Sequence, residues 1–353
     1  MICNSPKKNK MKATKYIFFL LLIAVIGSSI YIAVQPNTFE VSRTRTINAP
    51  AAVIYDNVID FKNWKDWSSW AEADKDMKIT LPQLTSGVNG AYSWEDKDGI
   101  GTMKTLGTDT NTSIKQEMQF ADYPSSDINW EFKSNNNGTT DVTWTISGKD
   151  LPFGFKAFSL FSGGMEKQIA PHYERSLEKL DSIVIADMKK YSVTVNGVTN
   201  HSGGYYLYNT ASCKIDELAN KISQMLPKVV KYAEENHITQ AGKPFVNYIK
   251  WDVENNAAIF SSCIPTTERV ITLEGGIITG ELPRFKAIKT TLKGNHSNLN
   301  EAWETTKKYI LKNGFEATEN GPMIEAYITD KKNNPNPANW ITEIYIAIKD
   351  TLK

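Results

Sequence analysis

Apolar and polar positions follow several distinct patterns along the chain. Residues 16–34 are apolar on every side and carry no charge. Between residues 39 and 147, short runs of alternating apolar and polar residues predict antiparallel strands. Residues 165–188 then repeat apolar side chains at helical spacing, and after residue 190 both periods recur in mixed order. The pattern predicts an α+β protein in which an N-terminal apolar helix precedes two domains.

The apolar stretch 16–34 is long enough to cross a membrane. As a helix it would span roughly 28 Å at about 1.5 Å per residue, close to the hydrocarbon thickness of a bilayer. Two arginines, Arg43 and Arg45, follow it closely. Five lysines precede it: Lys7, Lys8, Lys10, Lys12 and Lys15. The positive-inside rule therefore predicts a cytoplasmic tail at 1–15, a transmembrane anchor at 16–34, and soluble domains on the outer, periplasmic or extracellular side.

A cleaved signal peptide is the alternative reading of the same stretch. Such a peptide would have a shorter apolar core and would end in a small-x-small site. Gly27-Ser28-Ser29 is a poor cleavage site, and apolar residues resume at Ile30. We therefore favour the uncleaved anchor, with Met11 as a second plausible start of the chain.

Composition excludes several function classes. The formal net charge is +1, so we expect no broad electrostatic attraction to nucleic acid. The cysteines at 3, 213 and 263 have no CxxC spacing, and the four histidines are scattered, so we expect no metal and no cofactor. Cys213 and Cys263 could pair outside the cell or be buried as small apolar residues. The sequence does not indicate a protein partner.

Residues 38–186 resemble the SRPBCC superfamily, which includes START-like and polyketide-cyclase-like domains. That superfamily has a helix-grip fold, in which a curved sheet wraps a long helix around an apolar cavity. The resemblance lies in Arg45-Thr46-Ile47-Asn48-Ala49-Pro50, in Asp60-Phe61-Lys62-Asn63-Trp64 continuing to Trp70, and in the helix at 165–188. It implies a similar cavity here, lined from Trp94, Met118, Trp130, Trp144 and Phe153. The alternative is that these aromatic side chains simply fill a core.

Residues 190–353 contain an internal repeat of strand, helix, strand and strand. Equivalent points such as Pro244 and Pro322 lie about eighty residues apart. The domain resembles the gyrase-inhibitor-like effector-binding domain of AraC-type and multidrug-responsive regulators, which predicts a duplicated two-layer α+β fold. The resemblance lies in Gly242-Lys243-Pro244-Phe245-Val246-Asn247-Tyr248, Lys293-Gly294-Asn295-His296 with Ala302-Trp303, and Trp340-Ile341-Thr342-Glu343-Ile344-Tyr345-Ile346.

The second resemblance implies a ligand site. In that family a cleft between the two halves binds amphipathic, often cationic molecules, and a glutamate of the last strand sits in the cleft. Here Glu343 would be that charge, and the rings near it would be Tyr248, Trp303, Tyr345 and Trp340. The alternation of the last strand agrees, because Glu343 lies on the face opposite Ile344, Ile346 and Ile348. The alternative is that Glu343 faces water on an open sheet.

Three functions follow from these patterns. The first, which we favour, is a membrane-anchored protein that senses or sequesters an amphipathic, cationic or lipophilic small molecule. The second is a hydrolase or cyclase acting in one of the two clefts. Glu343 with Tyr205, Tyr206 or Tyr248 could supply a base, but no spacing demands it, so we assign no catalytic residue. The third is a protein-interaction module. The regulators carry a DNA-binding domain where this chain has its SRPBCC-like domain, which argues against a transcription factor.

Overall fold

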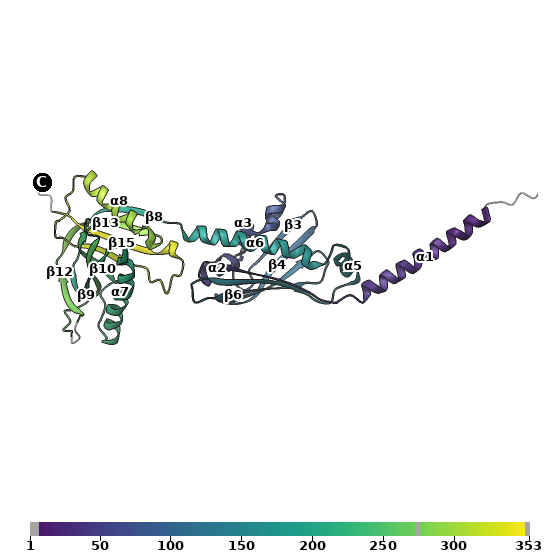
Figure 1. Cartoon of the computed structure of the whole chain (residues 1–353), viewed down its shortest axis with the longest axis horizontal. Helices are drawn as coiled ribbons and strands as arrows, with labels where there is room; N and C mark the ends of the chain where they lie inside the picture. Colours follow the sequence, from purple (N-terminus) through teal and green to yellow (C-terminus); the bar gives the residue numbers. More distant parts are fainter. Residues whose placement is uncertain (1–6, 273–275, 350–353) are drawn as a thin grey trace, which may run out of the picture. The chain divides into compact units, whose positions relative to one another are not determined.

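The computed structural model describes residues 7–272 and 276–349. They fall into two compact units, which divide in the sequence between Ile185 and Ala186. Figure 1 shows the elements of both units, and each unit is described by itself below.

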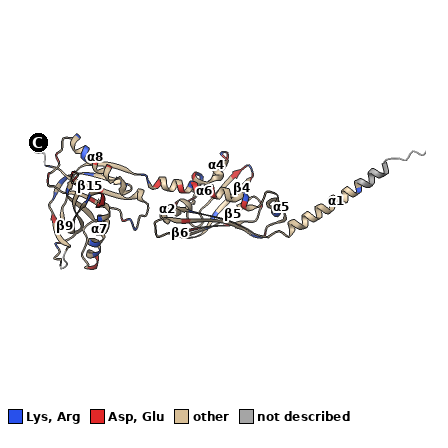
Figure 2. Ribbon diagram, viewed as in Figure 1, with Lys and Arg blue, Asp and Glu red and all other residues tan. Residues whose placement is uncertain are grey.

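The chain begins with one long apolar helix, α1 (Lys7–Ala33). Its segment Thr14–Ala33 has a mean hydropathy of 2.4 and only 6 % of its most apolar window is buried. The sequence of α1 has no charged residue after Lys15, and Figure 2 shows this part of the helix in tan. The expected apolar helix is thus present and mostly exposed. Length and composition suit a membrane span, although a signal sequence has the same character.

The first unit is built on a seven-stranded antiparallel sheet in the order β1-β7-β6-β5-β4-β3-β2. Its strands are β1 (Phe39–Ile47), β2 (Lys78–Thr80), β3 (Ala91–Asp96), β4 (Gly99–Asp109), β5 (Ser113–Phe120), β6 (Ser126–Ser134) and β7 (Thr140–Gly148). Its other elements are α2 (Ala51–Ile59), η1 (Phe61–Asn63), α3 (Trp64–Trp67), α4 (Ser69–Ala73), α5 (Phe153–Phe161) and α6 (Met165–Met188).

One face of this sheet packs on the long helix α6. The burial of β7 alternates strictly between buried and half-buried positions, because successive side chains of a strand point to opposite faces. The buried side of α6 includes the predicted apolar stripe, namely Ile169, Tyr173, Leu177, Leu180 and Val184. The helix-grip arrangement expected from the sequence is therefore confirmed.

The second unit is built on an eight-stranded sheet in the order β12-β9-β11-β10-β14-β15-β13-β8. Its strands are β8 (Ser192–His201), β9 (Gly204–Lys214), β10 (Phe245–Asp252), β11 (Ala257–Thr266), β12 (Ile278–Leu282), β13 (Phe285–Lys293), β14 (Met323–Tyr327) and β15 (Ile341–Ala347). Its helices are η2 (Ile215–Glu217), α7 (Leu218–Glu235), η3 (His296–Asn298), α8 (Leu299–Lys312) and η4 (Pro337–Asn339).

The second unit contains two successive series of elements in the same order. Strand β9, helix α7 and strands β10 and β11 are followed by β13, α8, β14 and β15. The two series join where β10 pairs antiparallel with β14, with Phe245 opposite Ala326. Both helices cover one face of the sheet, since α8 packs with Ile344 and Ile346, and α7 packs with Val246. Cys213 and Cys263 are free thiols in this unit.

Candidate functional site

The register of β14 and β15 decides which carboxylate faces the helices. Glu325 of β14 lies opposite Ile344 of β15, and Ala326 lies opposite Glu343. Residues directly opposite each other in a sheet point to the same face. Because Ile344 packs in the core beneath α8, Glu325 also points to the helix-covered face, whereas Glu343 points to the other face.

Glu325 is the centre of a cluster of aromatic donors on the helix-covered face. The residue is only 2 % exposed. Its Oε2 accepts hydrogen bonds from Tyr248 Oη at 3.2 Å and from Trp303 Nε1 at 3.0 Å. Its Oε1 accepts one from Tyr327 Oη at 2.5 Å. These donors come from β10, α8 and β14, so the two series of elements together enclose the carboxyl group.

The surroundings of Glu325 disfavour its charged form. Burial raises the pKa of this carboxyl group, and the hydrogen bonds from Tyr327, Trp303 and Tyr248 offset that rise only in part. Burial also raises the pKa of the Tyr248 and Tyr327 hydroxyls well above the usual value, so both keep their protons and remain donors. The hydrogen-bond partners of Glu325 among the described residues are all uncharged. None of the three donors that bond to the Glu325 carboxyl group is therefore a cation.

A second group of rings adjoins Tyr327. The His296 ring lies 5.1 Å from the Tyr327 ring and 5.1 Å from the Trp340 ring, between centroids. Burial, with a smaller effect from the charge of Lys331, lowers the pKa of His296 to about 4. His296 is therefore neutral at pH 7. Lys331 Nζ lies 4.4 Å from the centroid of the Trp340 ring, a cation–π distance.

Glu343 occupies a different environment. Its Oε1 lies 2.7 Å from Lys289 Nζ, and its Oε2 accepts a hydrogen bond from Tyr345 Oη at 2.5 Å. The Tyr345 ring meets the ring of His201 edge-on, 5.2 Å between centroids. The charge of Glu343 is thus already balanced by a lysine of the neighbouring strand.

The structure therefore does not bring the five predicted residues of this domain into one cluster. Tyr248 and Trp303 surround Glu325, Trp340 is connected to that cluster through His296, and Glu343 and Tyr345 lie on the opposite face of the sheet. The sequence analysis missed Glu325. Its signal is a single charge in the otherwise uncharged strand β14, where alternation places it on the same side as the Tyr327 ring.

The five residues predicted for the helix-grip cavity also do not form one cluster. Trp130 and Trp144 are buried and stack on each other at 4.3 Å between centroids. Trp144 also stacks on Tyr173 of α6 at 3.7 Å, so these rings pack as a core. Of the other three predicted residues, Trp94 is connected to that stack through the rings of Tyr92 and Trp64. Trp94 stacks with Tyr92 and Phe120, Met118 is half-buried, and Phe153 is 50 % exposed on α5.

The core of the first unit nevertheless contains unpaired polar atoms. Among the described residues, Trp67 Nε1, Trp144 Nε1, Gln116 Nε2 and Thr105 Oγ1 are buried and have no hydrogen-bond partner. Gln116 Oε1 accepts a bond from Trp130 Nε1 at 3.2 Å, so Gln116 touches the ring stack. Buried polar atoms are normally paired. These four atoms depart from that rule in the packed core of the unit.

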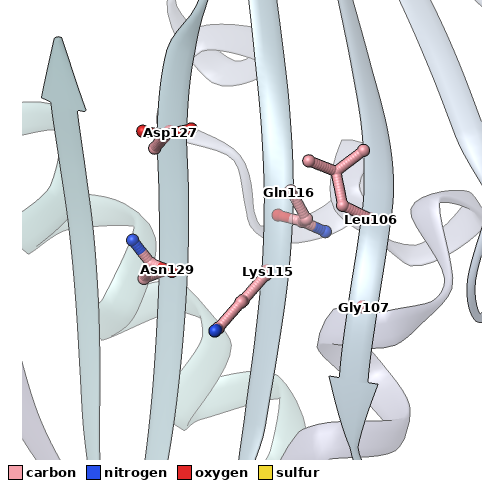
Figure 3. Close-up of a pocket in the computed structure, with 6 residues that line it drawn as sticks. All are labelled: Leu106, Gly107, Lys115, Gln116, Asp127 and Asn129. Carbon is pink, nitrogen blue, oxygen red and sulfur yellow. The ribbon is translucent and has the colours of Figure 1, made fainter. Parts of the chain in front are cut away.

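A surface depression crosses β4, β5 and β6 of the first unit (Figure 3). Its volume is about 330 Å³. The residues that line it are Leu106, Gly107, Lys115, Gln116, Asp127 and Asn129. Lys115 and Asp127 are exposed and have opposite charges, so the depression favours neither an apolar ligand nor an ion of one sign.

Two family models match the chain. Residues 206–349 match the GyrI-like small molecule binding domain. Residues 38–184 match the family described as polyketide cyclase / dehydrase and lipid transport. The chain therefore contains a GyrI-like small-molecule-binding domain after an SRPBCC domain, and both resemblances drawn from the sequence are confirmed. No curated protein matches the chain.

Several solved structures are similar to part of the chain. The crystal structure of the EcmrR C-terminal domain is 18 % identical, with a TM-score of 0.37, and the match covers 45 % of this chain and 98 % of that one. Protein CV1439 from Chromobacterium violaceum is 16 % identical, with a TM-score of 0.32 and coverage of 42 % and 98 %. SAV2435, described as bound to tetraphenylphosphonium, is 11 % identical, with a TM-score of 0.35 and coverage of 46 % and 94 %.

Proposed function

We propose that this protein is a membrane-anchored binding protein whose second unit senses or sequesters an amphipathic organic cation at Glu325. One observation carries the proposal. A buried carboxyl group is held by two tyrosine hydroxyls and a tryptophan N–H, all of them uncharged. Buried charges in proteins are usually paired or bound to a metal. A cationic ligand would supply the missing partner.

The chemistry of the site suits such a ligand. A cation near Glu325 would gain an ion pair in surroundings of low polarity, where electrostatic attraction is stronger than in water. The faces of Tyr248, Trp303 and Tyr327 would add cation–π contact and apolar area. The ligand charge would also lower the pKa of Glu325 towards its ordinary range. An amphipathic cation meets each of these conditions, whereas an anion would meet none.

Entry of a ligand requires the rings to separate, because Glu325 itself is almost fully buried. Trp303 and Tyr327 are only half-buried and form the exposed side of the cluster. Trp303 is carried by α8, whereas Tyr248 and Tyr327 are carried by the sheet. A shift of α8 relative to the sheet would open the cluster. Binding would thus stabilise a second arrangement of this helix, as expected of a sensor.

The membrane part of the proposal rests on α1. The helix is apolar over Thr14–Ala33 and mostly exposed. Lysines cluster before it, which favours an N-terminus in the cytoplasm and both domains on the outer side. An exposed apolar surface of this length is stable in a lipid bilayer rather than in water.

The test is a titration of the full chain with tetraphenylphosphonium. Glu325→Gln keeps the shape of the side chain but removes its charge, so we expect affinity to fall about tenfold to a hundredfold, the range of a charge-assisted contact. Glu343→Gln is the matched control, because it removes a carboxylate from the same sheet that is already paired with Lys289. Its affinity should remain close to that of the parent. Equal affinity in the parent and Glu325→Gln, or an equal loss in both variants, would contradict the proposal.

A further inference from the structure

Helix α5 presents an apolar face outward. Its apolar residues Phe153, Phe158, Leu160 and Phe161 are 50 %, 54 %, 36 % and 81 % exposed. At about 100° per residue in an α-helix, these four side chains fall on one side of α5. A helix on the surface of a soluble domain normally turns such a face inward. The outward face of α5 therefore needs a partner.

The opposite side of α5 is held on the first unit. The Phe155 ring stacks on Phe39 of β1 at 5.9 Å between centroids, with an angle of 20° between the planes. It also meets the Tyr123 ring edge-on at 5.4 Å. These contacts fix which side of the helix faces the domain. The rotation of α5 that leaves its apolar face outward is therefore set by packing within the unit.

The same helix is bonded to the end of α1. Lys156 Nζ donates to Ala33 O at 3.3 Å and to Gln35 O at 3.0 Å. The last carbonyl groups of a helix lack partners within the helix, and a lysine near them satisfies both their hydrogen bonding and their partial negative charge. Ile32 near the end of α1 is also buried, at 6 % exposed. Helix α5 thus lies beside the point where the apolar segment ends.

We propose that α5 lies in the membrane–water interface, with Phe153, Phe158, Leu160 and Phe161 among the lipid acyl chains. The inference rests on the anchoring role proposed above for α1. If α1 spans the bilayer, its last turn reaches the interface, and a helix bonded to Ala33 lies at the same level. Interfacial helices bury their apolar face about 5–10 Å into this boundary. We choose lipid rather than another protein as the occupant because α5 is bonded to the end of the apolar helix α1.

The interfacial position would hold the first unit against the bilayer. A single span leaves the domain that follows it free to rotate about the connecting residues. A second contact through α5, which Lys156 bonds to the end of α1, would keep one end of the helix-grip domain at the lipid surface. Uncharged lipophilic molecules in the membrane would then lie close to that domain.

The experiment uses the full chain in vesicles of dioleoylphosphatidylcholine, with the photoreactive residue p-benzoylphenylalanine placed at one position at a time. Positions Phe158 and Phe161 test α5, Ile23 tests α1, and Leu106 is the control, since it is 50 % exposed on β4. These side chains are all exposed, so the replacements should leave the fold intact. We expect lipid adducts, detected by mass spectrometry, at Phe158, Phe161 and Ile23 but not at Leu106.

Other outcomes would distinguish a failure of the α5 inference from a failure of the α1 anchor. Adducts at Ile23 without any at Phe158 and Phe161 would overturn the interfacial position of α5 and leave the anchor intact. Cross-links from Phe161 to a second copy of the chain, in place of lipid, would overturn it too, because the face would then be a protein contact. Failure at Ile23 would show that α1 is not in the bilayer, which overturns the anchoring and this inference together.

Discussion

The interiors of the two units contain the same kinds of aromatic side chain in different arrangements. In the first unit Trp144 stacks on both Trp130 and Tyr173, so these aromatic rings bury one another. In the second unit Tyr248 and Trp303 turn their polar atoms toward one carboxyl group. The comparison teaches that a concentration of aromatic residues does not by itself mark a binding site. What distinguishes the second interior is the buried acid at its centre.

The two arrangements also differ in their effect on stability. Burying large rings removes apolar surface from water and favours folding. Burying a carboxyl group opposes folding, unless a partner compensates for the lost water. The first interior should therefore contribute to the stability of its unit, and the second should cost stability in the absence of a ligand. One substitution in each unit of the full chain can test this contrast.

The largest expected effect is in the first unit. Trp144→Ala removes a ring that is 2 % exposed, so the free energy of unfolding should fall by about 3–5 kcal/mol, the range for truncating a buried large aromatic residue. Chemical unfolding of the full chain in detergent measures this change. Phe153→Ala, at a half-exposed position on α5, is the control and should cost much less. A loss as small as that of Phe153→Ala would mean that Trp144 lines an open cavity and not a packed core.

A smaller effect is expected in the second unit, and it depends on pH. Burial raises the pKa of Glu325 above its ordinary value of 4.5. Below that value the carboxyl group is protonated in both the folded and unfolded chain. As pH rises above it, the unfolded chain ionises first, so stability is lost until the folded-state pKa has been passed. Glu325→Gln cannot ionise and should escape this loss.

Thermal unfolding of the parent and Glu325→Gln, without ligand, measures the difference between about pH 4.5 and pH 8. The midpoint of the variant should rise relative to that of the parent as pH increases. The other titrating groups, including His296, are common to both proteins and cancel in the comparison. A difference that stays constant across this range would show that Glu325 has the same pKa in both states. The two interiors would then not differ in the way described.

The architecture could be predicted largely from periodicity. The stripe from Ile169 to Val184 identified the long helix, and alternation identified the strands, because both depend on which side chains a local element buries. The two family resemblances rested on the order of these elements together with the sequence motifs quoted for each domain. What periodicity could not supply is whether a buried ring lines a cavity or fills it. That depends on packing between segments far apart in the sequence, as with Trp144 and Tyr173.

The candidate site also depends on contacts between distant segments, which periodicity cannot supply. Alternation correctly placed Glu343 on the face of β15 opposite Ile344 and Ile346, but it did not show which neighbours complete each face. The pairing of β14 with β15 and the position of Trp303 on α8 bring the donors to Glu325. The ion pair of Glu343 with Lys289 likewise depends on the register of β13 against β15. Register and helix packing are long-range properties, so the alternation of one strand could not show which residues surround Glu325 and Glu343.

The most direct test of Glu325 as a cation site compares two ligands of similar shape and different charge. Methyltriphenylphosphonium is a cation, and triphenylphosphine oxide is its neutral counterpart, so the ratio of their affinities isolates the contribution of charge. In the full chain we predict that the cation binds about tenfold to a hundredfold more tightly than the neutral ligand. In Glu325→Gln the two affinities should become nearly equal, whereas Glu343→Gln should keep the preference of the parent. The same preference for the cation in the parent and in Glu325→Gln would contradict the account.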